Sequence, residues 1–228
     1  MHATPAASRS SAAPRAIRVW DLPTRLFHWT LVALIAFCWW TAEEHRYDLH
    51  LWSGMAVISL ILFRLLWGLF GSSTARFANF VRGPAAVRDY LAGKWRGVGH
   101  SPLGALSVIA FLGLVAVEAG LGLFASDEDG LLLGPLSGFI SLGASEQVTE
   151  LHEDFFNVLL ALIGLHVAAV LFYWIAKKQN LIGPMLTGKA ALDPDAEPMR
   201  PAKWWAALLC VIAAIAVTRW IIAGAPPL

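Results

Sequence analysis

Two histidines, His152 and His166, stand fourteen residues apart in the segment HEDFFNVLLALIGLH, which is otherwise largely apolar. Fourteen residues of α-helix rise by about 21 Å and return to nearly the same face. The hydrocarbon core of a bilayer is about 30 Å thick. In a membrane-spanning helix the two imidazoles would therefore point to the same side, one in each leaflet. Polar side chains are costly at such depths, and they mark functional sites by default.

The composition supports a membrane location for this segment. Of 228 residues, 57% are hydrophobic and only 14% are charged, which is typical of an integral membrane protein. The net charge of +1 gives no reason to expect nucleic-acid binding. Cys38 and Cys210 lie in apolar runs and are interpreted as small buried hydrophobes. The chain has no C-x-x-C-H motif, the signature of covalently attached c-type haem.

Five stretches approach the roughly 20 apolar residues that a membrane helix needs, at 24–42, 49–70, 102–125, 152–176 and 204–223. They predict an all-α integral membrane fold, with a four-helix membrane domain over 19–188. A linker over 189–203 and an additional transmembrane helix within 204–228 would follow. Residues 1–18 are predicted to be a flexible, retained tail. The apolar run 131–144 is too short to span, and we expect it at the interface or folded over the outer end of the bundle.

The predicted loops differ in charge, which indicates the orientation. Fourteen of the 17 basic residues fall on one side: Arg9, Arg15, Arg18, Arg25, Arg76, Arg82, Arg88, Lys94, Arg96, Lys177, Lys178, Lys189, Arg200 and Lys203. The opposite loops carry Glu43, Glu44, Asp48, Asp127, Glu128, Asp129, Glu146 and Glu150. Because basic loops stay in the cytoplasm, the N-terminus is predicted inside and the C-terminus outside.

This topology pairs four histidines by depth. His28 begins the first helix from the inside and His50 begins the second from the outside, while His152 and His166 are outer and inner residues of the fourth. The pairs are therefore His28 with His166 in the inner leaflet, and His50 with His152 in the outer leaflet.

Two histidines that face each other in a helix bundle can clamp one flat macrocycle through its iron, so two pairs could hold two haems. A membrane histidine can instead be a hydrogen-bonding packing residue. A zinc-type site would need three or four ligands at one depth, whereas the topology gives two and two. We favour haem over packing, and packing over zinc.

Three further residues lie near the predicted haems. Arg25, three residues before His28, would lie at the edge of the inner haem and pair with a propionate. Arg64, fourteen residues after His50, lies on the same face and deeper; it either contacts an inner propionate or snorkels to the surface. Gly54, one turn after His50, would let a ring approach the helix closely.

Two other polar residues have less definite interpretations. Glu118, near the outer end of the third helix, could relay protons, contact a quinone near the outer haem, or be a protonated carboxyl group hydrogen-bonded to a neighbouring helix; the last is slightly favoured. His100 begins the third helix at the inner interface and has no obvious partner as a ligand.

The motifs VWDLPTRLFHW, HLWSGMAVISLILFRLLWGLFG, HSPLGALS, DEDGLLLGPLSGFIS and HEDFFNVLLALIGLH resemble the bacterial cytochrome b561 family, which includes nickel-iron hydrogenase cytochrome b subunits. The resemblance covers roughly residues 18–188. It implies a four-helix bundle with two b-type haems, ligated at His28, His50, His152 and His166. The chain is more similar to short members that accompany periplasmic c-type cytochromes than to hydrogenase subunits. The fifth helix lies outside the family core.

The sequence thus predicts a dihaem b-type cytochrome of a bacterial inner membrane. It would carry electrons between the quinone pool and a periplasmic redox partner, either a c-type cytochrome or a hydrogenase-like subunit, with quinone as a further candidate ligand. One alternative is a quinone-coupled oxidoreductase acting on a diffusible oxidant such as superoxide. Others are a haem-free, proton-coupled transporter or scaffold, and a haem-carrying assembly subunit without turnover.

Overall fold

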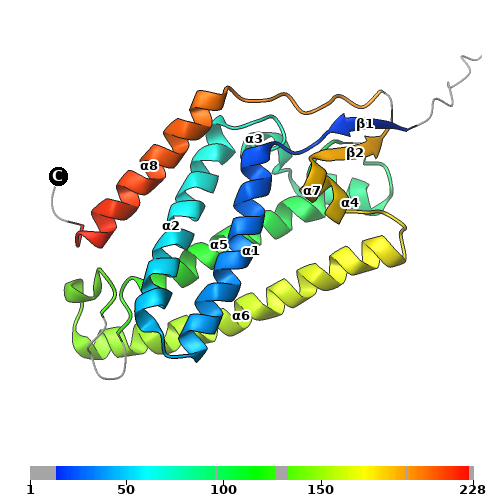
Figure 1. Cartoon of the computed structure of the whole chain (residues 1–228). Helices are drawn as coiled ribbons and strands as arrows, with labels where there is room; N and C mark the ends of the chain where they lie inside the picture. Colours follow the sequence, from blue (N-terminus) through cyan, green and yellow to red (C-terminus); the bar gives the residue numbers. More distant parts are fainter. Residues whose placement is uncertain (1–13, 96, 127–132, 194, 226–228) are drawn as a thin grey trace, which may run out of the picture.

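The structure, a computed structural model, describes residues 14–95, 97–126, 133–193 and 195–225. Within these residues five helices are long and apolar enough to cross a membrane. They are α1 (Leu22–Glu43), α2 (Tyr47–Phe70), α5 (Pro102–Gly122), α6 (Leu142–Ile175) and α8 (Trp204–Ile222). The predicted all-α membrane fold with five spanning helices is confirmed (Figure 1).

Shorter elements cluster where the basic loops lie. These are α3 (Phe77–Phe80), α4 (Pro84–Leu91), α7 (Ile182–Thr187) and the strands β1 (Arg15–Arg18) and β2 (Lys189–Leu192). We call this side, formed by residues 14–21, 71–95, 97–101, 176–193 and 195–203, the basic end. The opposite side, formed by residues 43–50, the described parts of 123–152 and the end of α8, is the acidic end. Arg9, Arg96, Asp127, Glu128 and Asp129 lie outside the described residues.

The beginnings of the helices follow ordinary capping chemistry. The Asp21 side chain accepts from the Thr24 backbone N–H at 2.6 Å, and Ser101 caps α5 directly before Pro102. Asp21 also accepts from the indole Nε1 of Trp67 at 3.1 Å and from the Ser72 hydroxyl. The Asp21 carboxyl group therefore caps the N-terminus of α1 and also links α1 to the basic end of α2.

The bundle core lies between α2, α5 and α6. Its buried residues are Val57, Ile61, Leu112, Val115 and Leu159. Many large apolar side chains instead point outward, as expected where the solvent is lipid. Backbone polar groups must be satisfied within the protein at that depth, and helices meet this requirement.

Helix α8 packs along α2. Cys210 and Ala214 are buried against Phe63 and Trp67, and the Ser59 hydroxyl donates to Thr218 Oγ1 at 2.8 Å. Small residues at the contact allow close approach of the two helices. The fifth helix is thus part of the packed structure.

The predicted tail and the predicted linker contact each other in the structure. We expected the tail to be flexible, but its last residues form a strand. Arg15–Arg18 pairs antiparallel with Lys189–Leu192. Ile17 is buried, and the Met199 N–H donates to the Arg18 carbonyl at 2.9 Å. Residues 15–18 are therefore held to the segment that leads into α8.

Helix α6 begins ten residues earlier than the predicted start at 152. Ser141 caps it, accepting from the Ala144 N–H at 3.3 Å. The first turns are polar, so an apolar-run criterion does not detect them. Consequently residues 142–144 of the short run 131–144 belong to α6, while 131–132 lie outside the described residues.

Candidate functional site

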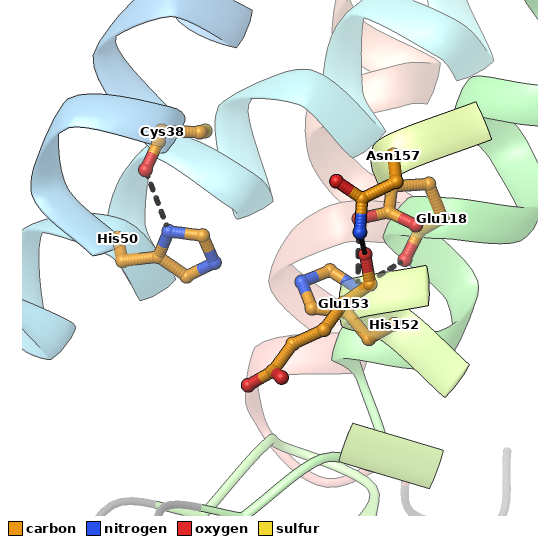
Figure 2. Close-up of polar contacts among 6 residues, drawn as sticks. All are labelled: Cys38, His50, Glu118, His152, Glu153 and Asn157. Atoms are coloured by element: carbon orange, nitrogen blue, oxygen red, sulfur yellow. Dashed lines mark hydrogen bonds and ion pairs between the residues drawn. The ribbon is translucent and has the colours of Figure 1, made fainter. Parts of the chain in front are cut away.

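His50 and His152 face each other across the bundle near the acidic end. His50 lies in the first turn of α2 and His152 in α6. Their ring centroids are 5.9 Å apart and the ring planes make an angle of 82°. Figure 2 shows the two imidazoles pointing toward one another from opposite sides. This is one of the two pairs that the topology predicts.

Backbone carbonyls of neighbouring helices fix the Nδ1 side of both rings. His50 Nδ1 lies 2.9 Å from the Cys38 carbonyl of α1, and His152 Nδ1 lies 3.0 Å from the Glu118 carbonyl of α5. A carbonyl only accepts, so each Nδ1 carries a hydrogen, and in the neutral form of each ring Nε2 carries none. The lone pair of each neutral ring is therefore on Nε2, the tautomer of a metal-ligating histidine.

The separation of the rings suits an iron ion between them. Two metal–nitrogen bonds of about 2 Å each, together with the inner halves of both rings, span about 6 Å between ring centres. A Cβ added to Gly54 would meet no atom within 4 Å. The space directly beside Gly54 is therefore open, as a macrocycle bound at this pair would require, and the facing imidazoles supply the nitrogen ligands that haem iron takes.

Gly122 is a site residue that the sequence reasoning missed. A Cβ at this position would lie 3.2 Å from His152 Cε1, so glycine lets the imidazole lie against α5. Its spacing of four residues from Glu118 places both on one helix face, which is the signal that could have identified it.

His28 and His166 are the second predicted pair, toward the basic end. They come close enough to interact electrostatically. The His166 ring meets Phe111 edge-on at 5.4 Å. His28 Nδ1 is buried and has no hydrogen-bond partner among the described residues. Among the described residues, the nearest ring contacts of this pair are therefore to aromatic neighbours, His28 with Trp29 and His166 with Phe111, and His28 Nδ1 does not have the carbonyl contact that holds each ring of the first pair.

The two predicted arginines lie toward the basic end. Arg25 donates from Nη1 to the Leu186 carbonyl of α7, and its buried Nε lacks a partner in the described part of the chain. Arg64 is only 2% exposed, so it does not snorkel to the surface. Its guanidinium carbon lies 4.9 Å from the centre of the Phe77 ring, and Nη1 donates to the Ala75 carbonyl at 3.3 Å.

Glu118 lies beside the first histidine pair. It is 8% exposed, and its Oε1 is 3.2 Å from His152 Nδ1. The carboxyl group therefore contacts the neighbouring helix α6, as in the interpretation favoured from the sequence.

His100 lies apart from both pairs. Its ring centroid is 4.5 Å from that of Trp20 and 4.3 Å from that of Phe80. Burial, with a smaller contribution from the nearby Arg64 charge, lowers the pKa of His100 to about 3, although a hydrogen bond with the Thr74 backbone opposes the shift. His100 is thus a neutral, largely buried ring at the basic end.

The described residues contain no group of three or more histidine, cysteine, aspartate or glutamate side chains that could hold a metal ion. Paired histidines in a membrane helix bundle are instead typical of membrane b-type cytochromes. The family model of prokaryotic cytochrome b561 matches residues 19–188. The chain therefore belongs to this family, whose members are four-helix membrane bundles that bind two b haems and carry electrons across the bilayer. Searches of curated proteins and of solved structures returned no match.

Family membership makes the chain a multi-pass membrane cytochrome of prokaryotic type. The matched range contains all four paired histidines, whereas α8 lies beyond it. The predicted family and the additional fifth helix are therefore both confirmed.

The buried state of His100 predicts an acid-sensitive stability. The unfolded chain takes up a proton at this ring near pH 6.5, whereas the folded chain resists it to about pH 3. Stability should therefore fall as the pH drops through this window, by about 2 kcal/mol at pH 5 from this residue alone. Thermal melts followed by tryptophan fluorescence between pH 7 and pH 4 measure the effect.

His100→Phe should flatten the pH dependence of the melting temperature. His45→Phe, a change at an exposed histidine between α1 and α2, is the matched control and should retain the wild-type slope. Equal slopes in all three proteins would contradict a buried neutral His100.

Proposed function

We propose that the four histidines hold two b haems in pairs, His50 with His152 at the acidic end and His28 with His166 at the basic end. The observation that carries this proposal is the geometry of the first pair. Its ring centroids are 5.9 Å apart, and both Nδ1 atoms are occupied by backbone carbonyls. Each Nε2 is then left for iron. The proximity of His28 to His166 supports the second pair.

Haem iron, when bound, takes up and releases single electrons, and two sites at different depths would connect the two faces of the membrane. The protein supplies ligands of fixed tautomer, and its apolar helices exclude water. Arg25 and Arg64 are the proposed partners of haem propionates at the basic end. Arg25 has a buried Nε without a partner in the described structure, and Arg64 is a buried cation that contacts aromatic rings and one carbonyl. A buried guanidinium such as Arg64, or a buried guanidinium nitrogen such as Arg25 Nε, favours an anionic partner.

A pyridine haemochrome assay with protein quantitation tests the ligand assignment. Wild-type protein purified in detergent should contain two b haems per chain. His166→Ala and His152→Ala should each reduce the content toward one, because each removes a ligand of a different pair. His45→Ala, outside the helices, should retain two. Retention of both haems in His166→Ala and His152→Ala would reject the pairing.

We further propose that the basic end faces the cytoplasm of a bacterial cell and the acidic end the periplasm. The distribution of lysine and arginine supports this orientation. Glu43, Glu44, Asp48, Glu146 and Glu150 are all exposed at the acidic end. Such a surface steers a positively charged redox protein toward the membrane. The proposed electron path therefore joins the quinone pool to a basic periplasmic partner, with a c-type cytochrome as the best fit.

Membrane vesicles of defined orientation test the path. In right-side-out vesicles, haems reduced by a soluble ubiquinol analogue should be reoxidised by an added basic c-type cytochrome, at a rate that falls as ionic strength rises. Replacing Glu146 and Glu150 together by glutamine should slow the reaction several-fold. Replacing the exposed Lys177 and Lys178 at the other end is the matched control and should not. Faster reaction in inverted vesicles would contradict the orientation.

The same experiment separates the alternative functions. Haems that quinol does not reduce would indicate a haem-carrying assembly subunit. Reoxidation of the quinone-coupled haems by superoxide but not by the added cytochrome would favour an oxidoreductase acting on a diffusible substrate.

A further inference from the structure

Glu118 approaches the same nitrogen of His152 twice. Its backbone carbonyl oxygen lies 3.0 Å from Nδ1, and its carboxyl Oε1 lies 3.2 Å from Nδ1. Figure 2 shows both contacts on the side of the imidazole that faces Glu118 and is turned away from His50. The residue is buried, and its Oε2 has no hydrogen-bond partner among the described residues. Burying a carboxyl group is costly, so its position against the ring calls for a physical reason.

Holding α5 against α6 does not require this carboxyl group. Thr149 of α6 accepts from the Ser126 N–H at 3.0 Å and donates to the Ser126 carbonyl at 2.9 Å. Ser145 donates to the Phe124 carbonyl at 2.6 Å. These bonds fix the segment that directly follows α5 on α6, within two turns of His152, without any contribution from Glu118.

The carboxyl contact also distinguishes His152 from the other paired histidines. His50 Nδ1 has the Cys38 carbonyl as its partner, and His28 Nδ1 has none among the described residues. An additional acceptor at Nδ1–H orients the ring and makes Nε2 a stronger electron donor. A stronger donor stabilises ferric over ferrous iron, and hydrogen bonds beyond the ligands are an established means of tuning haem potentials.

We propose that Glu118 is a positioning residue for His152: its carboxyl group orients the imidazole and lowers the reduction potential of the haem at the acidic end. This inference rests on the proposed ligation by His50 and His152. It gives the protein a means of setting the two haem potentials apart, because the carboxyl group acts on one pair only.

Spectroelectrochemistry and electron paramagnetic resonance on the purified dihaem protein test the proposal. Glu118→Met keeps a similar side-chain volume and removes the acceptor oxygens. It should raise the midpoint potential of one haem and change the ferric low-spin signal of that haem, leaving the other unchanged. Glu118→Gln, whose amide oxygen can still accept from Nδ1–H, should restore both properties toward wild type. Glu118→Asp is a second test if the methionine variant does not bind haem. Its shorter side chain moves the carboxyl oxygens away from Nδ1, so it should raise the midpoint potential of the same haem.

Glu153→Gln is the matched control. It removes the same type of side chain from the position next to His152, but Glu153 is exposed and its carboxylate points away from the imidazole (Figure 2). This variant should keep both wild-type potentials. An equal upward shift in Glu153→Gln would show a general charge effect and overturn the proposal, as would unchanged potentials and resonance signals in the methionine and aspartate variants.

His166→Ala assigns the affected haem, and it distinguishes a failure of the ligand pairing from a failure of the proposed role of Glu118. The haem that remains in this variant should be the one whose potential responds to Glu118. A His166→Ala protein with two haems would reject the ligand pairing itself. A single remaining haem that does not respond to Glu118→Met would reject only the role of Glu118.

Discussion

The hydrogen bonds from imidazole Nδ1 to backbone carbonyls are the interaction on which the acidic-end site depends. An imidazole in a membrane interior is stable only when its polar atoms have partners. At His50 and His152 the neighbouring helices α1 and α5 supply carbonyls at 2.9 and 3.0 Å. These bonds select one tautomer and aim the opposite nitrogens at each other. A helix bundle that satisfied both nitrogens internally would have no ligating capacity left.

The packing of the bundle follows from this requirement. Helices α1 and α5 must approach the two histidine-bearing helices closely enough for a main-chain contact. Gly122 allows this at α5, where a Cβ would lie 3.2 Å from the His152 ring. At the basic end, Asp21 ties α1 to Trp67 and Ser72 at the end of α2. The helices are therefore held to one another at both ends, and a Cβ at Gly54 would still meet no atom within 4 Å.

Much of this arrangement could be predicted from the sequence because it depends on hydrophobic length and on loop charge. Those two properties define five spanning helices and the depth of each histidine. The early start of α6 was missed because its first turns are polar, and only the cap at Ser141 marks its beginning. The pairing of β1 with β2 was missed because the two strands are far apart in the sequence, with helices α1 to α7 between them. The carbonyls of Cys38 and Glu118 carry no residue-specific signal, so their contacts require the folded structure.

The most direct test of the paired-histidine sites is near-infrared magnetic circular dichroism of the oxidised wild-type protein, since the charge-transfer band of ferric low-spin haem reports the axial ligands. We predict bis-imidazole ligation at both haems, with an intensity that corresponds to two irons per chain. A five-coordinate haem, or a haem with a non-histidine axial ligand, would contradict the paired-histidine assignment.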